Sequence, residues 1–375
     1  VKSARLTMSK NARERLARAE AEVLNAGIDW YAEWRDKPVI PCSFEATDVQ
    51  LPGPEKQHVH QVRYFRGPPS ARQYASSQEK GAPLVLLHGL GGGVGTFAAV
   101  LPVLRDSWKG PLFALDMFGC CLSSRPIFGF GYGSDKDYEG AQRFFTAPLE
   151  QWRKAVGLGQ LILCGHSMGG FVATCYAHHY PKSVDRLILA SCAGLDHQPE
   201  DGGTCCCLTY LWDNQMEFFK CFLGIPCLGK MIVRNFFATF RDASWLDKSL
   251  EAEYLHGSLT CGQASGLKMG EVLLSPSGDN PYPLEDFFGK LQVRFVSLVF
   301  ARDEENLDTG TNTMQALAAS GRPHELLLID DGIGAHEFMF SNPIGFAEAI
   351  LASGSGLSNG QLFGTGALSR EFGEQ

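Results

Sequence analysis

The stretch "LILCGHSMGGFVATCYAHHYP", residues 161–181, places a short aliphatic run directly before a serine that is flanked by glycines. The run 161–164 is typical of a strand that is buried on both faces of a parallel sheet. Apolar residues then recur at helical spacing until Tyr180 and Pro181 end the pattern. Because no residues remain for a loop, we expect a tight, strained turn with Ser167 at its apex. This G-x-S-x-G pattern indicates a nucleophile elbow, which exposes a serine hydroxyl above a sheet.

Length and composition limit the class of protein. With 375 residues, of which 45% are hydrophobic, the chain can bury one large core, or a core and a cap. A net charge of -8 argues against a nucleic-acid partner, which would need a basic face. The 12 cysteines are irregularly spaced, and Cys164, Cys175 and Cys192 fall in apparent core elements. We therefore expect reduced thiols and a cytoplasmic location. The chain contains no apolar run long enough to predict a transmembrane helix.

The order of the predicted elements indicates an α/β protein with a mostly parallel central sheet flanked by helices. After a hairpin at 44–50 and 59–65, strands expected at 84–87, 112–115, 161–164, 187–190, 293–299 and 325–329 alternate with helical stretches. The alternation stops between about 195 and 290, where aromatic-rich helical sequence predicts a cap. The predicted parts are an N-terminal helical arm 1–40, a core at 41–194 and 291–352, a helical cap 195–290 and a flexible tail 353–375.

The N-terminal arm allows two interpretations. Residues 4–26 read as a charged helix, and "WYAEW" follows at 30–34. Trp30 and Trp34 would suit the headgroup boundary of a lipid surface, so peripheral membrane docking is one reading. The other reading is a helix packed on the protein body.

A serine nucleophile needs donors for the developing oxyanion. "LVLLHGLGGGVGTF", residues 84–97, supplies a glycine-rich turn after a strand. We expect the backbone N–H groups of Leu90 and Met168 to form the oxyanion hole, and His88 to order the loop. A nucleotide-binding loop is disfavoured, because the Gly-Lys-Ser/Thr of a Walker A motif is missing.

The base and the acid are expected after the last two strands of the core. His336 follows the final predicted strand, as the chain order Ser…Asp/Glu…His requires. Asp303 lies three residues beyond the preceding strand and is favoured over Asp308, which needs a longer loop. Either carboxylate would fix the tautomer of the imidazole. Four further histidines are expected at the surface or at helix ends: His58, His60, His178 and His179.

Several stretches resemble one family. "HGLGGGVG", "LDMFGCCLSSRP", "LEQWRKAVGLGQLILCGHSMGGFVATCYAHHYP" and "VDRLILASCAGL" are similar to the abhydrolase-domain-containing 4/5 subfamily of α/β hydrolases. The resemblance is strong over 84–196 and fair over 251–350. It implies an α/β-hydrolase fold with an inserted helical cap. Its members include an N-acyl-phosphatidylethanolamine lysophospholipase and a lipid-droplet lipase coactivator; the coactivator branch has asparagine at the elbow, so Ser167 makes this chain similar to the catalytically competent branch.

Two positions depart from the subfamily pattern. The H-x-x-x-x-D motif, which is linked to acyl transfer to lysophosphatidic acid, starts at His336 but reaches Ser341 in place of aspartate. The acid of the family usually stands beside a tryptophan, and neither Asp303 nor Asp308 does. The choice between these two carboxylates therefore stays open.

The resulting hypothesis is a serine hydrolase that cleaves acyl esters of phospholipids or lysophospholipids. Most of the aromatic residues between 210 and 245 are expected to pack between the cap helices, and some of them would line a groove over Ser167 for an acyl chain. The alternatives are a small-ester esterase or thioesterase, a lysophosphatidic acid acyltransferase, and a non-catalytic scaffold that regulates a lipase at lipid droplets. No cofactor or metal is required, and the expected partners are a lipid ester and a membrane or droplet surface. Cys205, Cys206 and Cys207 are expected to be free thiols, or S-acylated at a membrane-facing cap.

Overall fold

The structure is a computed structural model that describes most of the chain outside the cap. The described residues are 8–35, 41–74, 79–130, 135–195, 223, 225–237, 243–263, 265–268, 283–302, 307–333, 335–353 and 368–372. Cysteines 205–207 and most of the aromatic-rich stretch lie outside these residues. So does Asp303.

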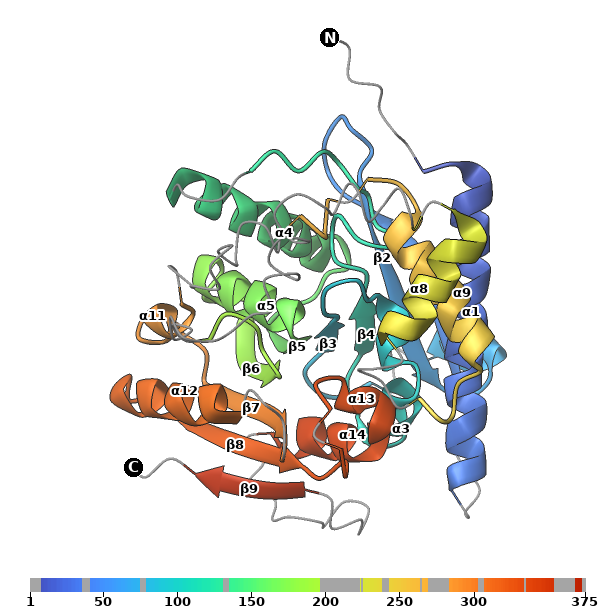
Figure 1. The fold of residues 1–375 in the computed structure, drawn as a ribbon. Helices are drawn as coiled ribbons and strands as arrows, with labels where there is room; N and C mark the ends of the chain where they lie inside the picture. Colours follow the sequence, from blue (N-terminus) through green and yellow to red (C-terminus); the bar gives the residue numbers. More distant parts are fainter. Residues whose placement is uncertain are drawn as a thin grey trace.

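One mixed sheet forms the centre of the molecule (Figure 1). Its strand order is β1-β2-β4-β3-β5-β6-β7-β8-β9, and the strands from β4 to β8 run parallel. The bounds are β1 Cys42–Gln50, β2 His58–Arg66, β3 Leu84–Leu87, β4 Leu112–Leu115, β5 Leu161–His166, β6 Val184–Ala190, β7 Phe295–Ala301, β8 His324–Ile329 and β9 Leu368–Phe372. The prediction of a mostly parallel sheet is therefore confirmed.

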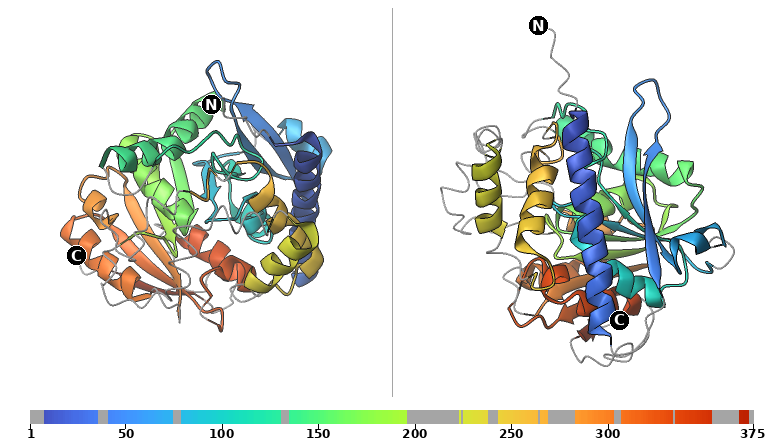
Figure 2. Two further views of the ribbon diagram at one scale, coloured as in Figure 1. Left: turned by 45° about the horizontal axis from the view of Figure 1, so that its top comes forward. Right: turned by 90° about the vertical axis from the view of Figure 1, so that its right-hand side faces the viewer.

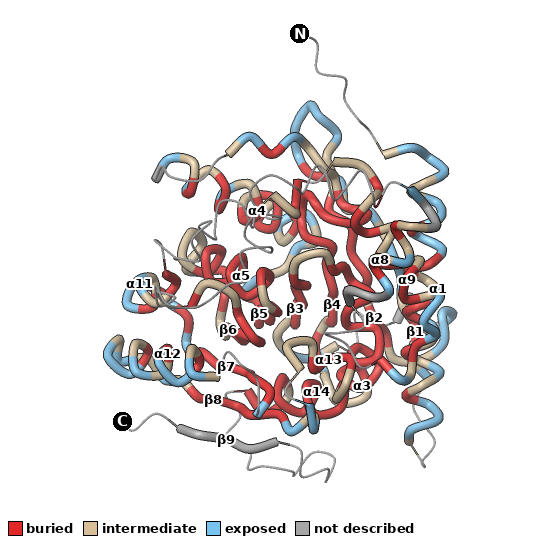
Figure 3. The backbone as a smooth tube through the Cα atoms, in the orientation of Figure 1, coloured by how far each residue is buried: buried red, intermediate tan, exposed pale blue. Residues whose placement is uncertain are grey.

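The central strands are short and apolar because helices cover both of their faces. All four residues of β3 and all four of β4 are buried, as expected for strands between two helical layers (Figure 3). The flanking helices and turns are α3 Val100–Ser107, α4 Asp135–Ala155, α5 Met168–His179, α11 Glu285–Phe288, α12 Leu307–Ala319, α13 Phe338–Ser341, α14 Pro343–Ala352 and the short 3-10 turns Pro69–Tyr74 and Val94–Phe97.

Helix α1 (Lys10–Trp34) is longer than the sequence predicts and packs on the protein body. It begins after Ser9, whose side chain accepts a hydrogen bond from the N–H of Ala12 at 3.2 Å. It continues through "WYAEW" because Tyr31 is buried against the body, whereas Trp34 stays 43% exposed. A packed helix is thus what the structure contains, and membrane docking stays a prediction.

Two helices of the predicted cap are described, α8 (Pro226–Phe237) and α9 (Lys248–Thr260). Helix α9 lies between α8 and α1 in both views of Figure 2. Trp245, just before α9, stacks on Phe340 with centroids 6.2 Å apart and contacts Trp30 of α1 at 6.3 Å. The cap and the N-terminal helix therefore form one layer beside the sheet.

The C-terminal end differs from the prediction. Residues 368–372 were expected in a flexible tail, but they form β9, which pairs antiparallel with β8. The reason is that β8 would otherwise be an edge strand with unpaired backbone groups. Among the described residues, no helix is both long enough and apolar enough to cross a bilayer.

Candidate active site

The turn between β5 and α5 is the strained elbow that the sequence predicts. Ser167 has φ +53° and ψ −120°, a conformation that costs a residue with a side chain about 1–3 kcal/mol. Backbone bonds hold it: the Ser167 N–H donates to Ala190 O at 2.9 Å, and the Ala193 N–H donates to Ser167 O at 3.1 Å. A Cβ at Gly165 would overlap the backbone oxygen of Gly169, so the turn requires glycine there.

The elbow places Ser167 at the N-terminus of α5. Met168 is the first residue of this helix, and the first N–H groups of a helix have no partner within it. The positive end of the helix dipole also faces this point. The Ser167 side chain is half-buried and makes no capping hydrogen bond. The site therefore combines a hydroxyl with backbone donors that favour a negative charge.

The glycine-rich turn after β3 lies directly against the elbow. A Cβ at Gly89 would stand 3.1 Å from the Cβ of Ser167. The turn is closed by the Gly92 N–H, which donates to Gly89 O at 3.2 Å, and Gly91 takes φ +72°. Leu90 forms the corner of this turn, directly after Gly89. Gly89 thus brings the glycine loop to the elbow, and Leu90 and Met168 as oxyanion donors stay a prediction.

His88 orders this loop, as predicted. Its Nδ1–H donates to Gly89 O at 2.8 Å, and its Nε2 accepts the N–H of Met117 at 3.0 Å. Burial lowers the pKa of His88 to about 4. The ring is therefore neutral, with one nitrogen as donor and the other as acceptor.

Asp116, at the end of β4, supports the same loop. Its two oxygens accept the N–H groups of Val94 and Leu122, each at 2.9 Å. Burial and the carboxylate of Glu20 raise the pKa of Asp116 to about 7, although the nearby His60 lowers it in part. No local sequence pattern points to Asp116, although it stands in "LDMFGCCLSSRP". Its role depends on contacts with two separate loops, which a single sequence does not reveal.

The predicted base lies beside the elbow. His336 is half-buried between β8 and α13, and its backbone oxygen accepts the Nε2–H of His166 at 3.0 Å. The rings of His166 and His336 have centroids 5.0 Å apart. His166 directly precedes Ser167 in the chain. The structure thus brings the loop of the base to the residue next to the serine.

Asp331 folds the loop that carries His336. Its Oδ1 accepts the N–H of Ile333 at 3.2 Å, and its Oδ2 accepts the N–H of Ala335 at 3.0 Å. The hydroxyl of Ser341 also donates to Oδ2, at 2.9 Å. Ser341 is the position where the subfamily motif would have aspartate. Here its hydroxyl closes the loop, and a second carboxylate would instead repel Asp331.

The acid of the triad is not decided by the described residues. Asp303 lies outside them, in the segment between β7 and α12. Asp308 is exposed in the first turn of α12, where a carboxylate interacts favourably with the helix dipole. Asp303 therefore stays a prediction, and the choice between Asp303 and Asp308 stays open.

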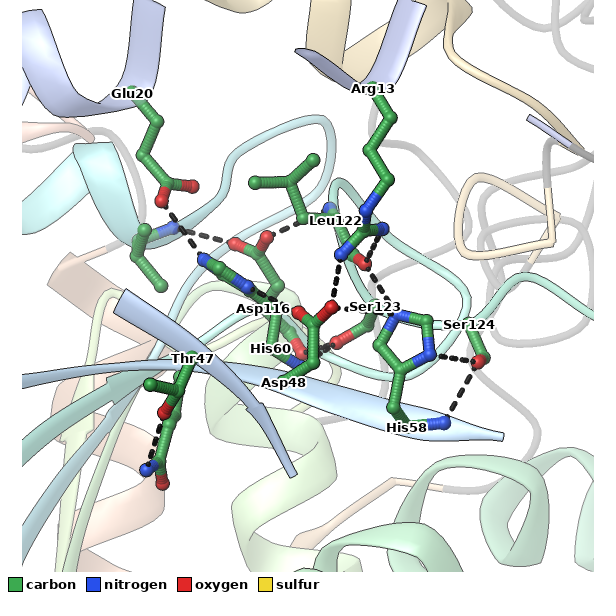
Figure 4. Close-up of polar contacts among 12 residues, drawn as sticks. Arg13, Glu20, Thr47, Asp48, His58, His60, Asp116, Leu122, Ser123 and Ser124 are labelled. Atoms are coloured by element: carbon green, nitrogen blue, oxygen red, sulfur yellow. Dashed lines mark hydrogen bonds and ion pairs between the residues drawn. The ribbon is translucent and has the colours of Figure 1, made fainter. Parts of the chain in front are cut away.

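An ion cluster joins α1 to strands β1 and β2 (Figure 4). His60 Nε2 lies 2.9 Å from Glu20 Oε1, and His60 Nδ1 lies 2.8 Å from Asp48 Oδ1. Arg13 pairs with Asp48 at 2.5 Å. Burial lowers the pKa of His60, but the carboxylates outweigh that effect and raise it to about 10. The prediction of His60 as a surface residue is wrong, because α1 covers it.

Comparison with known proteins identifies the fold. Residues 82–202 match the family described as the alpha/beta hydrolase fold. Carboxylesterase CesB of Bacillus subtilis is 15% identical, with a TM-score of 0.56, over 92% of this chain and 98% of its own. At that identity the likeness concerns the fold alone. With the sheet order and the strained turn at Ser167, these matches show that the chain has the α/β-hydrolase fold.

The chain is also similar to two curated relatives. It is 32% identical to 1-acylglycerol-3-phosphate O-acyltransferase ABHD5 of Homo sapiens over 169 residues, 45% of this chain and 43% of that protein. It is 41% identical to (lyso)-N-acylphosphatidylethanolamine lipase of Mus musculus over 124 residues, 33% of this chain and 34% of that protein. The resemblance to the abhydrolase-domain-containing 4/5 subfamily is thereby confirmed. The matches span less than half the length of these relatives.

Proposed function

We propose that this α/β hydrolase is a serine hydrolase that cleaves acyl esters of phospholipids or lysophospholipids. The observation that carries the proposal is the strained Ser167, which stands at a helix N-terminus against a glycine turn and beside the loop of His336. The lipid substrate class rests on the similarity to one relative, a (lyso)-N-acylphosphatidylethanolamine lipase.

In the proposed reaction, the Ser167 hydroxyl attacks the ester carbonyl carbon while the imidazole of His336 takes its proton. The carbonyl oxygen becomes an oxyanion that accepts the N–H groups of Leu90 and Met168; one such donor contributes about 2.7–4 kcal/mol. Asp303 would accept a hydrogen bond from the imidazolium of His336 and stabilise its positive charge. The tetrahedral intermediate expels the alkoxide, which receives the proton from His336. Water then cleaves the acyl-enzyme by the same steps and releases the fatty acid.

The nucleophile is tested by labelling with a fluorophosphonate probe. The wild type should be labelled, and Ser167→Ala should not be. Ser320→Ala, at the end of α12 and away from the site, is the matched control and should be labelled like the wild type. Equal labelling of wild type and Ser167→Ala would refute the proposal.

The substrate is tested with a lipid extract and mass spectrometry. Lysophospholipids and N-acylated phospholipids should lose an acyl chain with the wild type and stay intact with Ser167→Ala. A panel of esters from two to sixteen carbons separates a lipid hydrolase from a small-ester esterase or thioesterase. Highest kcat/KM on the shortest esters would favour the esterase reading.

Acyl transfer is a second candidate, because one relative is named an acylglycerophosphate acyltransferase. Ser341 stands where the linked motif has aspartate, so we expect hydrolysis to exceed transfer. The test supplies lysophosphatidic acid and a long-chain acyl-CoA and measures phosphatidic acid. Ser167-dependent formation of phosphatidic acid would establish transfer in place of hydrolysis.

A further inference from the structure

The glycine turn beside Ser167 is held from outside by the cap. Within the loop, the Gly92 N–H and the Nδ1–H of His88 both donate to Gly89 O, which holds the peptide between Gly89 and Leu90. The residues after Leu90 depend on partners outside the loop: the Cys121 thiol donates to Gly92 O at 2.9 Å, and Asp116 accepts the N–H of Val94. Two further groups near the corner have partners on α9. These are the carbonyl of Gly91 and the N–H of Gly95.

Tyr254 and Ser258 make these two contacts. The Tyr254 hydroxyl accepts the N–H of Gly95 at 2.9 Å. The Ser258 hydroxyl lies 2.9 Å from Gly91 O and 2.8 Å from Leu255 O of its own helix, so one proton is shared between two carbonyls. The two side chains stand one helical turn apart and are only 4% and 5% exposed. Water therefore does not compete for these bonds.

The glycine loop is shaped to receive the tyrosine. A Cβ at Gly95 would lie 2.7 Å from the Tyr254 ring, closer than real Cβ contacts. A Cβ at Gly93 would also collide with the Tyr254 hydroxyl. The run of glycines in "HGLGGGVG" is thus needed for docking of the cap as well as for the turn.

Helix α9 is itself fixed to the body. Asp247 caps its N-terminus by accepting the N–H groups of Ser249 and Leu250 at 2.9 and 3.0 Å. A Cβ at Gly257 would lie 3.0 Å from Leu16 of α1, which shows how closely the two helices approach. Helix α1 is anchored in turn by the ion cluster of Figure 4. The contacts to the glycine loop therefore come from a rigid support.

We propose that Tyr254 and Ser258 are positioning residues that fix the Leu90 amide as an oxyanion donor. The inference rests on the proposed function, since it assigns the cap a role in the same site. The bond from Ser258 holds the carbonyl of Gly91 and so fixes the peptide between Gly91 and Gly92, the second peptide after Leu90. The N–H of Gly95 is fixed at the far end of the loop. Without both contacts, residues 91–95 become more mobile, and the Leu90 amide is held from the Gly89 side alone, by His88 and Gly92.

The test compares Ser258→Ala, Tyr254→Phe and the double variant with the wild type. We expect kcat on a short acyl ester to fall about 10- to 100-fold in the double variant, below the loss for a whole oxyanion donor. KM should stay within threefold and the pH profile should not move, because the base is untouched. Ser258→Thr keeps the hydroxyl and should restore kcat. Tyr176→Phe, which removes a buried phenol bond of 2.6 Å to Glu150 elsewhere, should stay within twofold of the wild type.

Amide hydrogen exchange separates this inference from the proposed function. Exchange at residues 90–95 should become at least tenfold faster in the double variant, and this readout does not need catalysis. Wild-type protein without Ser167-dependent labelling would overturn the proposed function, and with it the oxyanion role. A folded double variant with kcat within twofold and unchanged exchange would overturn the positioning role alone. If the double variant does not fold, the kcat and the amide exchange of Ser258→Ala test the positioning role instead.

Discussion

Replacing two buried thiols should change the pH dependence of stability. Cys164 in β5 and Cys175 in α5 are free and fully buried. Burial raises the pKa of both thiols well above the usual range, so neither ionises in the folded protein at pH 9.5. In the unfolded chain a thiol ionises near pH 8.5. A raised folded pKa contributes stability that is complete below the unfolded pKa and is lost as the pH rises.

The magnitude follows from this difference. At pH 7 both forms keep the thiol protonated, and ionisation has no effect. At pH 9.5 the unfolded thiol is ionised by about ten to one, which lowers the free energy of unfolding by about 1.4 kcal/mol for each thiol. The Cys164→Ala/Cys175→Ala variant has neither thiol, so its free energy of unfolding does not fall by this combined amount of about 2.8 kcal/mol at pH 9.5. Removing each sulfur atom also costs about 1 kcal/mol, by analogy with deletion of a buried methyl group.

The assay is urea-induced unfolding followed by tryptophan fluorescence, with a phosphine reductant present. The double variant should be about 2 kcal/mol less stable than the wild type at pH 7 and slightly more stable at pH 9.5. Thr174→Ala is the matched control: it alters a buried residue beside Cys175 that does not titrate. Its stability difference from the wild type should be equal at both pH values. An equal stability difference between the double variant and the wild type at pH 7 and pH 9.5 would refute the predicted effect of thiol ionisation.

Two further substitutions test the geometry of the site. Gly165→Ala should destabilise the fold by more than about 3 kcal/mol, because the new Cβ meets the backbone of Gly169; Gly159→Ala, where the Cβ has open space, should stay within about 0.5 kcal/mol. Equal melting temperatures of the two variants would contradict the tight elbow. Ser341→Ala removes one of the bonds to Asp331 and should lower kcat about three- to tenfold with KM unchanged, as read from ester hydrolysis, while Ser341→Thr should keep the wild-type rate. An unchanged kcat in Ser341→Ala would mean that this bond does not position the base.

The sequence alone determined the elements whose signals are local. The strands at 84–87 and 112–115 have the predicted bounds, since an unbroken apolar run between helical stretches is enough to define a buried parallel strand. The elbow at Ser167 was equally predictable, because the missing loop and the two glycines leave the backbone one compact path. The fold class follows from the alternation of such elements along the chain.

The tertiary structure decided the contacts between distant segments. His60 became a buried ion because α1, forty residues earlier, covers it with Glu20. The bond from His166 to the backbone of His336 joins residues 170 positions apart. Tyr254 reaches Gly95 across 159 positions. No local pattern encodes such pairings, because they depend on which loops the parallel strands bring to the same edge of the sheet. The periodicity of a single sequence reports only how each segment is buried, and not against which partner.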